Sequence, residues 1–373
     1  MNILFLTTHL NTGGISVYLK TLTKELKKKG HRIFVASSGG DMVGQLTESG
    51  IEHIQLNIRT KSELNPKIYW SLGKLIQLIT EKNIQIVHAQ TRVTQVMGAL
   101  LSRLTGRVYL STCHGYFKTR LARRVFPCWG KSVIAISEPV AKHLAEDFGI
   151  DKQRIVLIYN GLDIRDFPVV DENIRQARRR EFDIHGSPII GIIARLSEVK
   201  GHRVLIKAMG LIVPKFPKAV LLVIGQGDIE NSLKQLVQDL KLQDHVRFLS
   251  VVDKTSTVLG LMDVFVMPSK QEGLGLSVME AQASGLPVVA SRVGGLPSLI
   301  RHGETGLLVK PNDESELSQA ILQLLGDRAK ALAMGQAARR FIEQEFSVDE
   351  MAEDTLRLYE HLLGSLRTTP KAG

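Results

Sequence analysis

The sequence lacks the features of a membrane-spanning or disulfide-stabilised protein. No stretch of about 18 apolar residues occurs, which argues against a membrane span. Residues 1–9 have no basic lead and only a short apolar run, so we interpret them as a first strand and not as a signal peptide. The two cysteines, Cys113 and Cys128, match no metal-binding spacing and indicate a reducing compartment. We therefore expect a cytoplasmic protein.

Acidic residues are absent from a long stretch of the N-terminal half. Residues 82–137 contain nine Lys and Arg and no Asp or Glu. Residues 1–165 hold 23 Lys and Arg against 11 Asp and Glu, whereas the remainder holds 25 against 26. The net charge of +11 therefore belongs to the N-terminal half. It indicates either an anionic partner on that half or a solvated basic face.

Signatures of metal and nicotinamide binding are missing as well. The sequence contains no Asp-x-Asp pair and no cluster of Cys and His, so a diphosphate held through a metal ion is not expected. The turn Gly225-Gln226-Gly227 lacks the third glycine of a dinucleotide fingerprint, because position 230 is Glu230. We expect neither a metal nor a cofactor.

The apolar pattern predicts two α/β domains, and the length of 373 residues suits that number. A strand at 3–6, a helix at 15–29 stopped by Gly30 and a strand at 33–36 form a βαβ unit, which requires a parallel sheet. Further strands are predicted at 54–56, 86–88, 108–112, 133–136 and 155–158, and then at 189–193, 219–224, 246–249, 264–267, 288–290 and 306–309.

The pattern also predicts where the domains end. Turn residues at 160–168 and a charged stretch at 171–181 indicate a linker. Ser347 and Glu350 form a capping box that should begin a last helix, ending near residue 363. We assign one domain to residues 1–165, a second to 166–346 and a C-terminal helical segment to 347–373.

Four loops that follow predicted strands carry candidate ligand-binding residues, because ligands collect at the C-terminal ends of parallel strands. In the loop after the strand at 264–267, Glu272 precedes two glycines and Glu280 lies one turn inside the following helix. The positive end of that helix suits a diphosphate, and the carboxylate of Glu280 suits the vicinal hydroxyls of a ribose. An ordinary helix N-terminus with acidic residues has the same pattern.

The other three loops are weaker when taken singly. Arg195 and Lys200 after the strand at 189–193 suit a departing diphosphate, although exposed cations are usually surface charges. The loop with Gly13 and Gly14 suits a phosphate or a tight turn. His114, at the end of the strand at 108–112, could face a cleft or be structural.

Together these motifs resemble the family 4 retaining glycosyltransferases of the GT-B fold, over nearly the whole chain. Glu272 and Glu280 match the family's E-x7-E signature, and residues 281–291 match its usual continuation. The resemblance implies an α/β protein of two Rossmann-like parallel-sheet domains that face a cleft. It also implies that residues 160–163 end the first domain and that the C-terminal helix crosses back to pack on it.

The resemblance implies roles for the candidate residues. Arg195 and Lys200 would hold the donor diphosphate, Glu280 its ribose and Glu272 the donor sugar, with His114 near the transferred sugar. Catalytic roles fall to Glu272, His114, Arg195 and Lys200. The remaining donor contacts would come from Gly14 of the opposite domain, from the base pocket of Gly225 and Val252, and from Gly273, Leu274, Gly275 and Leu276.

Two positions depart from the family pattern. Leu274 stands where an aromatic residue is common, and Gln282 replaces a frequent Met. Neither change removes a polar role, so we expect both to affect packing more than the family assignment.

The implied activity is the transfer of a hexosyl group from a nucleotide diphosphate sugar to an acceptor, with retention of configuration and without a metal ion. The leaving diphosphate would receive the acceptor's proton on the same face of the sugar. A role in cell-surface glycan or lipopolysaccharide-like glycolipid synthesis is expected. The alternatives are a GT-B nucleotide-sugar epimerase, which would need no acceptor, and a non-catalytic nucleotide-sugar-binding module, which would show no turnover.

Residues 117–131 predict a membrane contact. They carry five cations and no acid among Phe, Leu, Val and Trp, a composition that suits an anionic membrane surface. We expect peripheral attachment to the inner face of the membrane and a lipid-linked acceptor. In the alternative, the apolar side chains of this segment pack into the domain and its charges face water. These side chains are Phe117, Leu121, Val125 and Phe126. No nucleic-acid-binding motif accompanies the charge, so nucleic acid is not an expected partner.

Overall fold

The chain folds as two compact units. The computed structural model describes residues 1–60, 62, 65–119, 123, 126–169, 171–184, 187–250, 252 and 254–367. The first unit comprises Met1–Gly161 and the C-terminal helix, and the second comprises Leu162–Ser347.

The first unit is built on a seven-stranded parallel sheet in the order β3-β2-β1-β4-β5-β6-β7. Its strands are β1 (Asn2–Leu6), β2 (Arg32–Ser37), β3 (Glu52–Gln55), β4 (Ile86–Ala89), β5 (Val108–Cys113), β6 (Val133–Ala135) and β7 (Ile155–Leu157). Its helices are α1 (Gly14–Lys28), α2 (Val43–Glu48), α3 (Pro66–Glu81), α4 (Arg92–Thr105), α6 (Glu138–Phe148), α15 (Val348–Arg367) and the 3-10 turn η1 (Lys152–Arg154).

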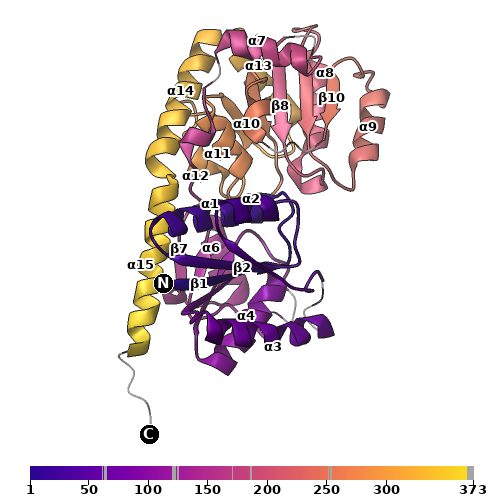
Figure 1. The fold of residues 1–373 in the computed structure, drawn as a ribbon. Coiled ribbons are helices and arrows are strands. Elements are labelled where there is room, and N and C mark those ends of the chain that lie inside the picture. Colours follow the sequence, from indigo (N-terminus) through magenta and orange to yellow (C-terminus); the bar gives the residue numbers. More distant parts are fainter. Residues whose placement is uncertain are drawn as a thin grey trace. The chain divides into compact units, whose positions relative to one another are not determined.

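Both faces of this sheet are buried, because successive side chains of a strand point to opposite faces. Ile3 and Phe5 of β1 join a core with residues of α1, α2 and α15. Leu4 and Leu6 join a separate core with residues of α3 and α4. Figure 1 shows α1 and α2 on one side of the sheet and α3 and α4 on the other.

The second unit has a six-stranded parallel sheet in the order β10-β9-β8-β11-β12-β13. Its strands are β8 (Ile189–Ile193), β9 (Val220–Ile224), β10 (Val246–Leu249), β11 (Val264–Met267), β12 (Val288–Ser291) and β13 (Leu307–Val309). Its helices are α7 (Glu172–Glu181), α8 (His202–Ile212), α9 (Glu230–Asp239), α10 (Thr255–Leu259), α11 (Leu276–Ala283), α12 (Leu296–Leu299), α13 (Glu314–Gly326), α14 (Arg328–Glu345) and the 3-10 turns η2 (Ile164–Asp166) and η3 (Glu198–Lys200).

The predicted α/β class is confirmed, and each predicted strand is present within two residues of its expected ends. In both sheets the strand order reverses direction beside the first strand of the unit, between β1 and β4 and between β8 and β11. Such a reversal opens a crevice at the carboxyl ends of the strands, where ligands of doubly wound sheets bind. The topology therefore selects the loops after these strands as candidate sites.

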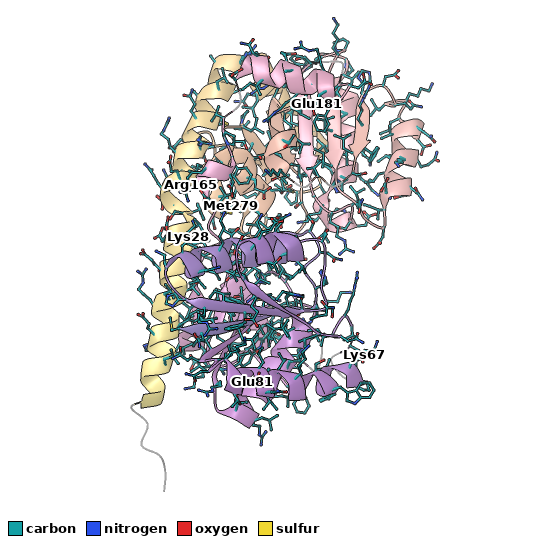
Figure 2. The ribbon with its side chains drawn as sticks, in the orientation of Figure 1. Lys28, Lys67, Glu81, Arg165, Glu181 and Met279 are labelled. Carbon is teal, nitrogen blue, oxygen red and sulfur yellow. The ribbon has the colours of Figure 1, made fainter. Side chains whose placement is uncertain are left out.

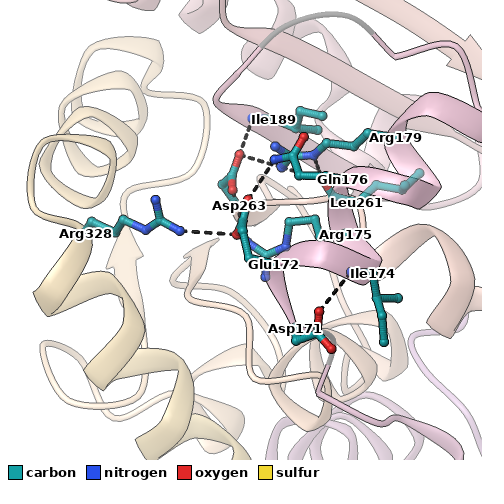
Figure 3. A network of polar contacts seen from close by, with 10 residues as sticks. All are labelled: Asp171, Glu172, Ile174, Arg175, Gln176, Arg179, Ile189, Leu261, Asp263 and Arg328. Atoms are coloured by element: carbon teal, nitrogen blue, oxygen red, sulfur yellow. Dashed lines mark hydrogen bonds and ion pairs between the residues drawn. The ribbon is translucent and has the colours of Figure 1, made fainter.

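The prediction of a linker at residues 171–181 is wrong. This stretch forms helix α7, and Arg175 and Arg179 bind the carboxylate of Asp263 at 3.2 and 2.8 Å (Figure 3). Arg179, of which 4% is exposed, also donates to the carbonyl oxygen of Leu261 at 2.7 Å. The helix is polar but anchored, because its arginines are paired with a carboxylate of the second unit.

A buried polar chain ties the C-terminal helix to the first sheet. His88 of β4 contacts the hydroxyl of Tyr359 through Nδ1 and the hydroxyl of Thr112 through Nε2, both at 2.7 Å. Tyr359, Thr112 and His88 are each fully buried. Burial lowers the pKa of His88 to about 3, so the ring is neutral and both of its nitrogens are satisfied by hydroxyl groups.

We predict that Tyr359→Phe lowers the free energy of unfolding by about 1–3 kcal/mol, because it leaves one nitrogen of His88 without its partner in a buried site. The matched control is Tyr69→Phe, since Tyr69 is 44% exposed and should change stability by less than about 0.5 kcal/mol. Urea denaturation monitored by circular dichroism provides the comparison. Equal stability of the two variants would show that the buried hydroxyl contributes nothing.

Candidate functional site

The loops after β8 and β11 lie side by side at the crevice of the second sheet. Lys270 N–H donates to the carbonyl oxygen of Val199 at 2.7 Å, which joins the two loops directly. Gly201 has a φ of +71°, and a Cβ there would lie 1.9 Å from the carbonyl oxygen of Pro268. Only glycine permits this close approach, so Gly201 fixes the separation of the two loops.

This packing brings together Lys200 and Glu272, two residues selected from the sequence. The ammonium of Lys200 lies 2.6 Å from Oε2 of Glu272, and the hydroxyl of Ser269 donates to the same oxygen at 3.2 Å. The side chains are 22% and 11% exposed, so the ion pair is mostly shielded from solvent. Because the Lys200 side chain is still partly exposed, an anionic ligand can reach its ammonium and replace the carboxylate of Glu272 as its partner.

Helix α11 begins beside this ion pair. Gly275 caps the helix with a φ of +109°, and a Cβ there would lie 2.7 Å from Cδ2 of Leu296. The free N–H groups of the first turn and the helix dipole favour an anion at this end. Glu280 lies inside the helix and is 8% exposed. Leu274 is 1% exposed, which agrees with the expectation that its departure from the family pattern affects packing.

A third loop, after β12, contacts the backbone of Glu272. The sequence analysis did not predict this contact. Gly295 N–H donates to the carbonyl oxygen of Glu272 at 3.3 Å. Gly294 has a φ of +53°, and a Cβ there would lie 1.8 Å from that oxygen. The Gly-Gly pair, four residues after the predicted strand at 288–290, was the available signal. Ser269 was also missed, and it carries no pattern of its own.

Arg195 is placed differently from Lys200. It is 71% exposed in its side chain, and its Nη2 lies 3.6 Å from a carboxylate oxygen of Asp228. The two cations therefore have different partners in this structure. The loop Gly225-Gln226-Gly227 lies against the same segment, since a Cβ at Gly225 would come within 2.1 Å of the carbonyl oxygen of Ala194. Val252 is partly buried, and both residues next to it lie outside the described part of the chain.

The first unit holds His114 at the end of β5. Its Nε2 lies 2.8 Å from Oε1 of Gln90, the residue that follows β4, and its ring meets Tyr18 edge-on at 4.8 Å. Burial lowers the pKa of His114 to about 3, so the imidazole is neutral. If Nε2 carries the proton that it donates to Gln90, Nδ1 is left as an acceptor. Gln90 was not selected from the sequence, although it directly follows a predicted strand.

Gly14 is the first residue of α1 and is exposed together with Gly13. The loop before it is held by Asp41, whose carboxylate accepts from the N–H and the hydroxyl of Thr12 at 2.7 and 3.0 Å. The first turn of α1 therefore presents backbone N–H groups to solvent.

The basic segment 117–131 divides between packed and exposed residues. Trp129 is 2% exposed and packs against Phe117 and Phe148, with ring centres 5.9 and 5.6 Å apart. Phe126 is 67% exposed. Arg120, Leu121, Arg124 and Val125 lie outside the described residues.

Within the described residues, no group of three or more His, Cys, Asp and Glu side chains could hold a metal ion. No helix in that part of the chain has the length and apolar character needed to cross a membrane.

Two known families match the chain in succession. Residues 12–166 match the family described as Glycosyltransferase Family 4, and residues 173–341 match Glycosyl transferases group 1.

Similar proteins cover most of the chain. N-acetyl-alpha-D-glucosaminyl L-malate synthase of Bacillus anthracis is 26% identical over 383 aligned positions, which cover 96% of each chain. A GDP-mannose-dependent alpha-(1-6)-phosphatidylinositol monomannoside mannosyltransferase of Mycobacterium tuberculosis is 30% identical over 75% of this chain and 76% of its own. The crystal structure of a glycosyltransferase from Rickettsia africae superposes with a TM-score of 0.85 at 26% identity, covering 99% of both chains.

The order of the two family matches, the parallel sheets and the likeness to these enzymes agree with one another, and the chain belongs to the family 4, group 1 glycosyltransferases of the GT-B fold.

Proposed function

We propose that this glycosyltransferase moves a hexosyl group from a nucleotide diphosphate sugar to an acceptor, with retention of the anomeric configuration and without a metal ion. The observation that carries the proposal is the Lys200–Glu272 ion pair, which lies at the crevice of the second sheet beside the N-terminus of α11. An ammonium and free backbone N–H groups at one place suit a diphosphate.

The same groups suit the departure of that diphosphate. The bond from the anomeric carbon to the phosphate oxygen breaks while a bond from the acceptor oxygen forms on the same face of the sugar. The acceptor's proton passes to the departing phosphate oxygen, so atoms and charge balance. Negative charge on the diphosphate grows as the bond breaks, and Lys200 and Arg195 would oppose it. Glu272 would then position the donor sugar, and Glu280 the ribose.

His114 would bind a hydroxyl group of the transferred sugar. Its neutral imidazole supports this role, since a nitrogen that carries no proton accepts a hydrogen bond from a hydroxyl. Gln90, at 2.8 Å, would hold the ring in that orientation.

The nature of donor and acceptor is suggested by the relatives. The mycobacterial enzyme is named for GDP-mannose and for a phosphatidylinositol substrate, and the Bacillus enzyme for a malate product. We propose a nucleotide sugar as the donor for this chain, and an acceptor that is linked to a lipid.

A membrane contact would bring the protein to such an acceptor. Phe126 is 67% exposed, and Lys118 and Lys131 of the same segment are also exposed. An apolar ring among cations can insert shallowly while the cations attract anionic headgroups, each contributing about 1 kcal/mol. We propose peripheral attachment of a cytoplasmic protein through residues 117–131.

We predict that Arg195→Ala and Lys200→Ala reduce transfer chiefly in kcat, because both side chains oppose charge that develops during bond breaking. Loss of one such contact should lower the rate on the order of 100-fold. Release of nucleoside diphosphate in a coupled assay measures it. Lys207→Ala is the control, since Lys207 is exposed on α8. Near-normal kcat in both variants would mean that the diphosphate binds elsewhere.

We predict that Glu272→Gln nearly abolishes transfer and leaves the fold intact, and that chelators do not inhibit the wild type. The amide keeps the shape of the carboxylate but loses its charge beside Lys200. Glu230→Gln removes an exposed surface partner of Lys234 and serves as the control. Activity that depends strictly on an added divalent ion would contradict the proposed protein-only diphosphate site.

We predict that the wild type sediments with vesicles rich in phosphatidylglycerol, and less so as salt is raised, because added ions screen the attraction. Phe126→Ser and the double variant Lys118→Ser, Lys131→Ser should bind more weakly, whereas Lys207→Ser should not. Equal binding to phosphatidylcholine vesicles, or none to either kind, would refute the membrane contact and leave the transferase proposal standing.

A further inference from the structure

A hollow lined by polar residues and Leu56 lies at the carboxyl ends of β2 and β3, outside the loops of the candidate donor site. Ser38, Gln55, Leu56, Asn57 and Arg59 line a space of about 440 Å³. Because β1 to β5 are parallel, this is the same edge of the first sheet at which Gly14 and His114 lie.

A second, smaller hollow adjoins the first and shares three of its lining residues. It measures about 190 Å³, and one wall is helix α3. Its lining consists of Gln55, Leu56, Asn57, Lys67, Trp70, Ser71 and Lys74. We call the two spaces together the α3 hollow.

The wall formed by α3 follows from the pattern of that helix. Ile68, Leu72, Leu75 and Ile79 are buried against the sheet. Lys67, Trp70, Ser71 and Lys74 recur at intervals of three and four residues, so they share one face. Figure 2 labels Lys67, which lies at the beginning of this helix.

The α3 hollow is positively charged. Arg59 and Lys67 are exposed, and neither forms an ion pair with any residue that the structure describes. Lys74 donates to the carbonyl oxygen of Gln55 at 3.0 Å. Among the described residues that line the hollow, none is acidic. Cations that have no carboxylate partner among the described residues favour an anionic ligand at a concave surface.

Arg59 also connects the hollow with the loop that follows β1. The pKa of His9 is lowered by burial and then by the positive charge of Arg59, while Asp41 opposes the shift. Asp41 accepts from the N–H and the hydroxyl of Thr12 at 2.7 and 3.0 Å, two residues before Gly14. The carboxylate of Asp41 is therefore already engaged by Thr12.

The framework of the hollow is set by the protein itself. The hydroxyl of Ser38 accepts from the N–H of Ile58 at 2.8 Å, which joins the segments after β2 and β3. Gly39, with a φ of +81°, lets the backbone pass the Gln55 side chain, since a Cβ would lie 3.2 Å from Oε1. The wall of the hollow that precedes Arg59 is therefore held by the protein's own contacts, which lowers the cost of binding.

Trp70 adds an apolar surface at the rim. It is 79% exposed, far more than the other large hydrophobic residues of α3. An indole face presented to solvent beside polar groups suits the C–H face of a sugar or polyol ring.

We propose that the α3 hollow binds an anionic group of the acceptor, a phosphate or a carboxylate, through Arg59 and Lys67, while Trp70 packs on a ring of the same molecule. This inference rests on the proposed function for its biological meaning. The binding itself does not require transfer to occur, so the two can fail separately.

Trp70 provides a direct readout. The chain contains two tryptophans, and the other, Trp129, is 2% exposed. Titration with myo-inositol 1-phosphate should change the tryptophan fluorescence to saturation, whereas myo-inositol should not. Inorganic phosphate should compete. Trp70→Phe should abolish the signal while leaving binding measurable by calorimetry.

Charge variants test the cations. Arg59→Gln and Lys67→Gln should each weaken binding of myo-inositol 1-phosphate by about tenfold. Lys24→Gln removes the same charge from an exposed position on α1 and should have no effect. Equal binding by all three variants, or equal responses to inositol and its phosphate, would overturn the proposal.

Vesicles distinguish the source of the anion. If phosphatidylinositol vesicles and soluble myo-inositol 1-phosphate both shift the fluorescence of Trp70, the hollow binds the phosphorylated headgroup whether or not it is attached to a lipid. A shift with phosphatidylinositol vesicles alone assigns the anion to a lipid. A shift with phosphatidylcholine vesicles would show instead that Trp70 is a membrane contact and would overturn the anion site. In the transfer assay, Arg59→Gln should raise KM for the acceptor and leave KM for the donor unchanged.

Discussion

The pairing of Lys200 with Glu272 is the contact on which the candidate donor site depends. The two residues are 72 positions apart in the sequence. Their loops come together because β8 and β11 are paired as parallel neighbours in the sheet. Gly201 and Gly294 then allow backbone to approach backbone where any side chain would collide. An ammonium is thereby held beside the N-terminus of α11, with a carboxylate that balances its charge.

The two units present different chemistry at equivalent edges of their sheets. The second unit offers a shielded ion pair, a helix N-terminus and the exposed Arg195, which suit a diphosphate. The first unit offers a neutral histidine and, farther along the edge, the basic α3 hollow. We propose that the donor's charge is met by the second unit and the acceptor's by the first. The basic character of residues 1–165 then belongs in part to substrate recognition.

The sequence predicted the elements better than the contacts between them. Strands such as β8 and β9 are short apolar runs, and their local pattern suffices. Helix α7 was mistaken for a linker because its stabilising contacts, from Arg175 and Arg179 to Asp263, lie more than 80 residues away. Strand order decides which charges meet, so the separate partners of Arg195 and Lys200 could not be foreseen. The α3 hollow was missed because Arg59 and Lys67 form no motif.

Calorimetric titration with nucleoside diphosphates, in the presence of a chelator, tests the central claim most directly. At least one nucleoside diphosphate should bind the wild type, the matching nucleoside should bind far more weakly, and Lys200→Ala should lose most of the affinity for the diphosphate while keeping its fold. This result would place the diphosphate at the Lys200–Glu272 pair. Undiminished binding by Lys200→Ala, or binding that appears only when a divalent ion is supplied, would contradict the account.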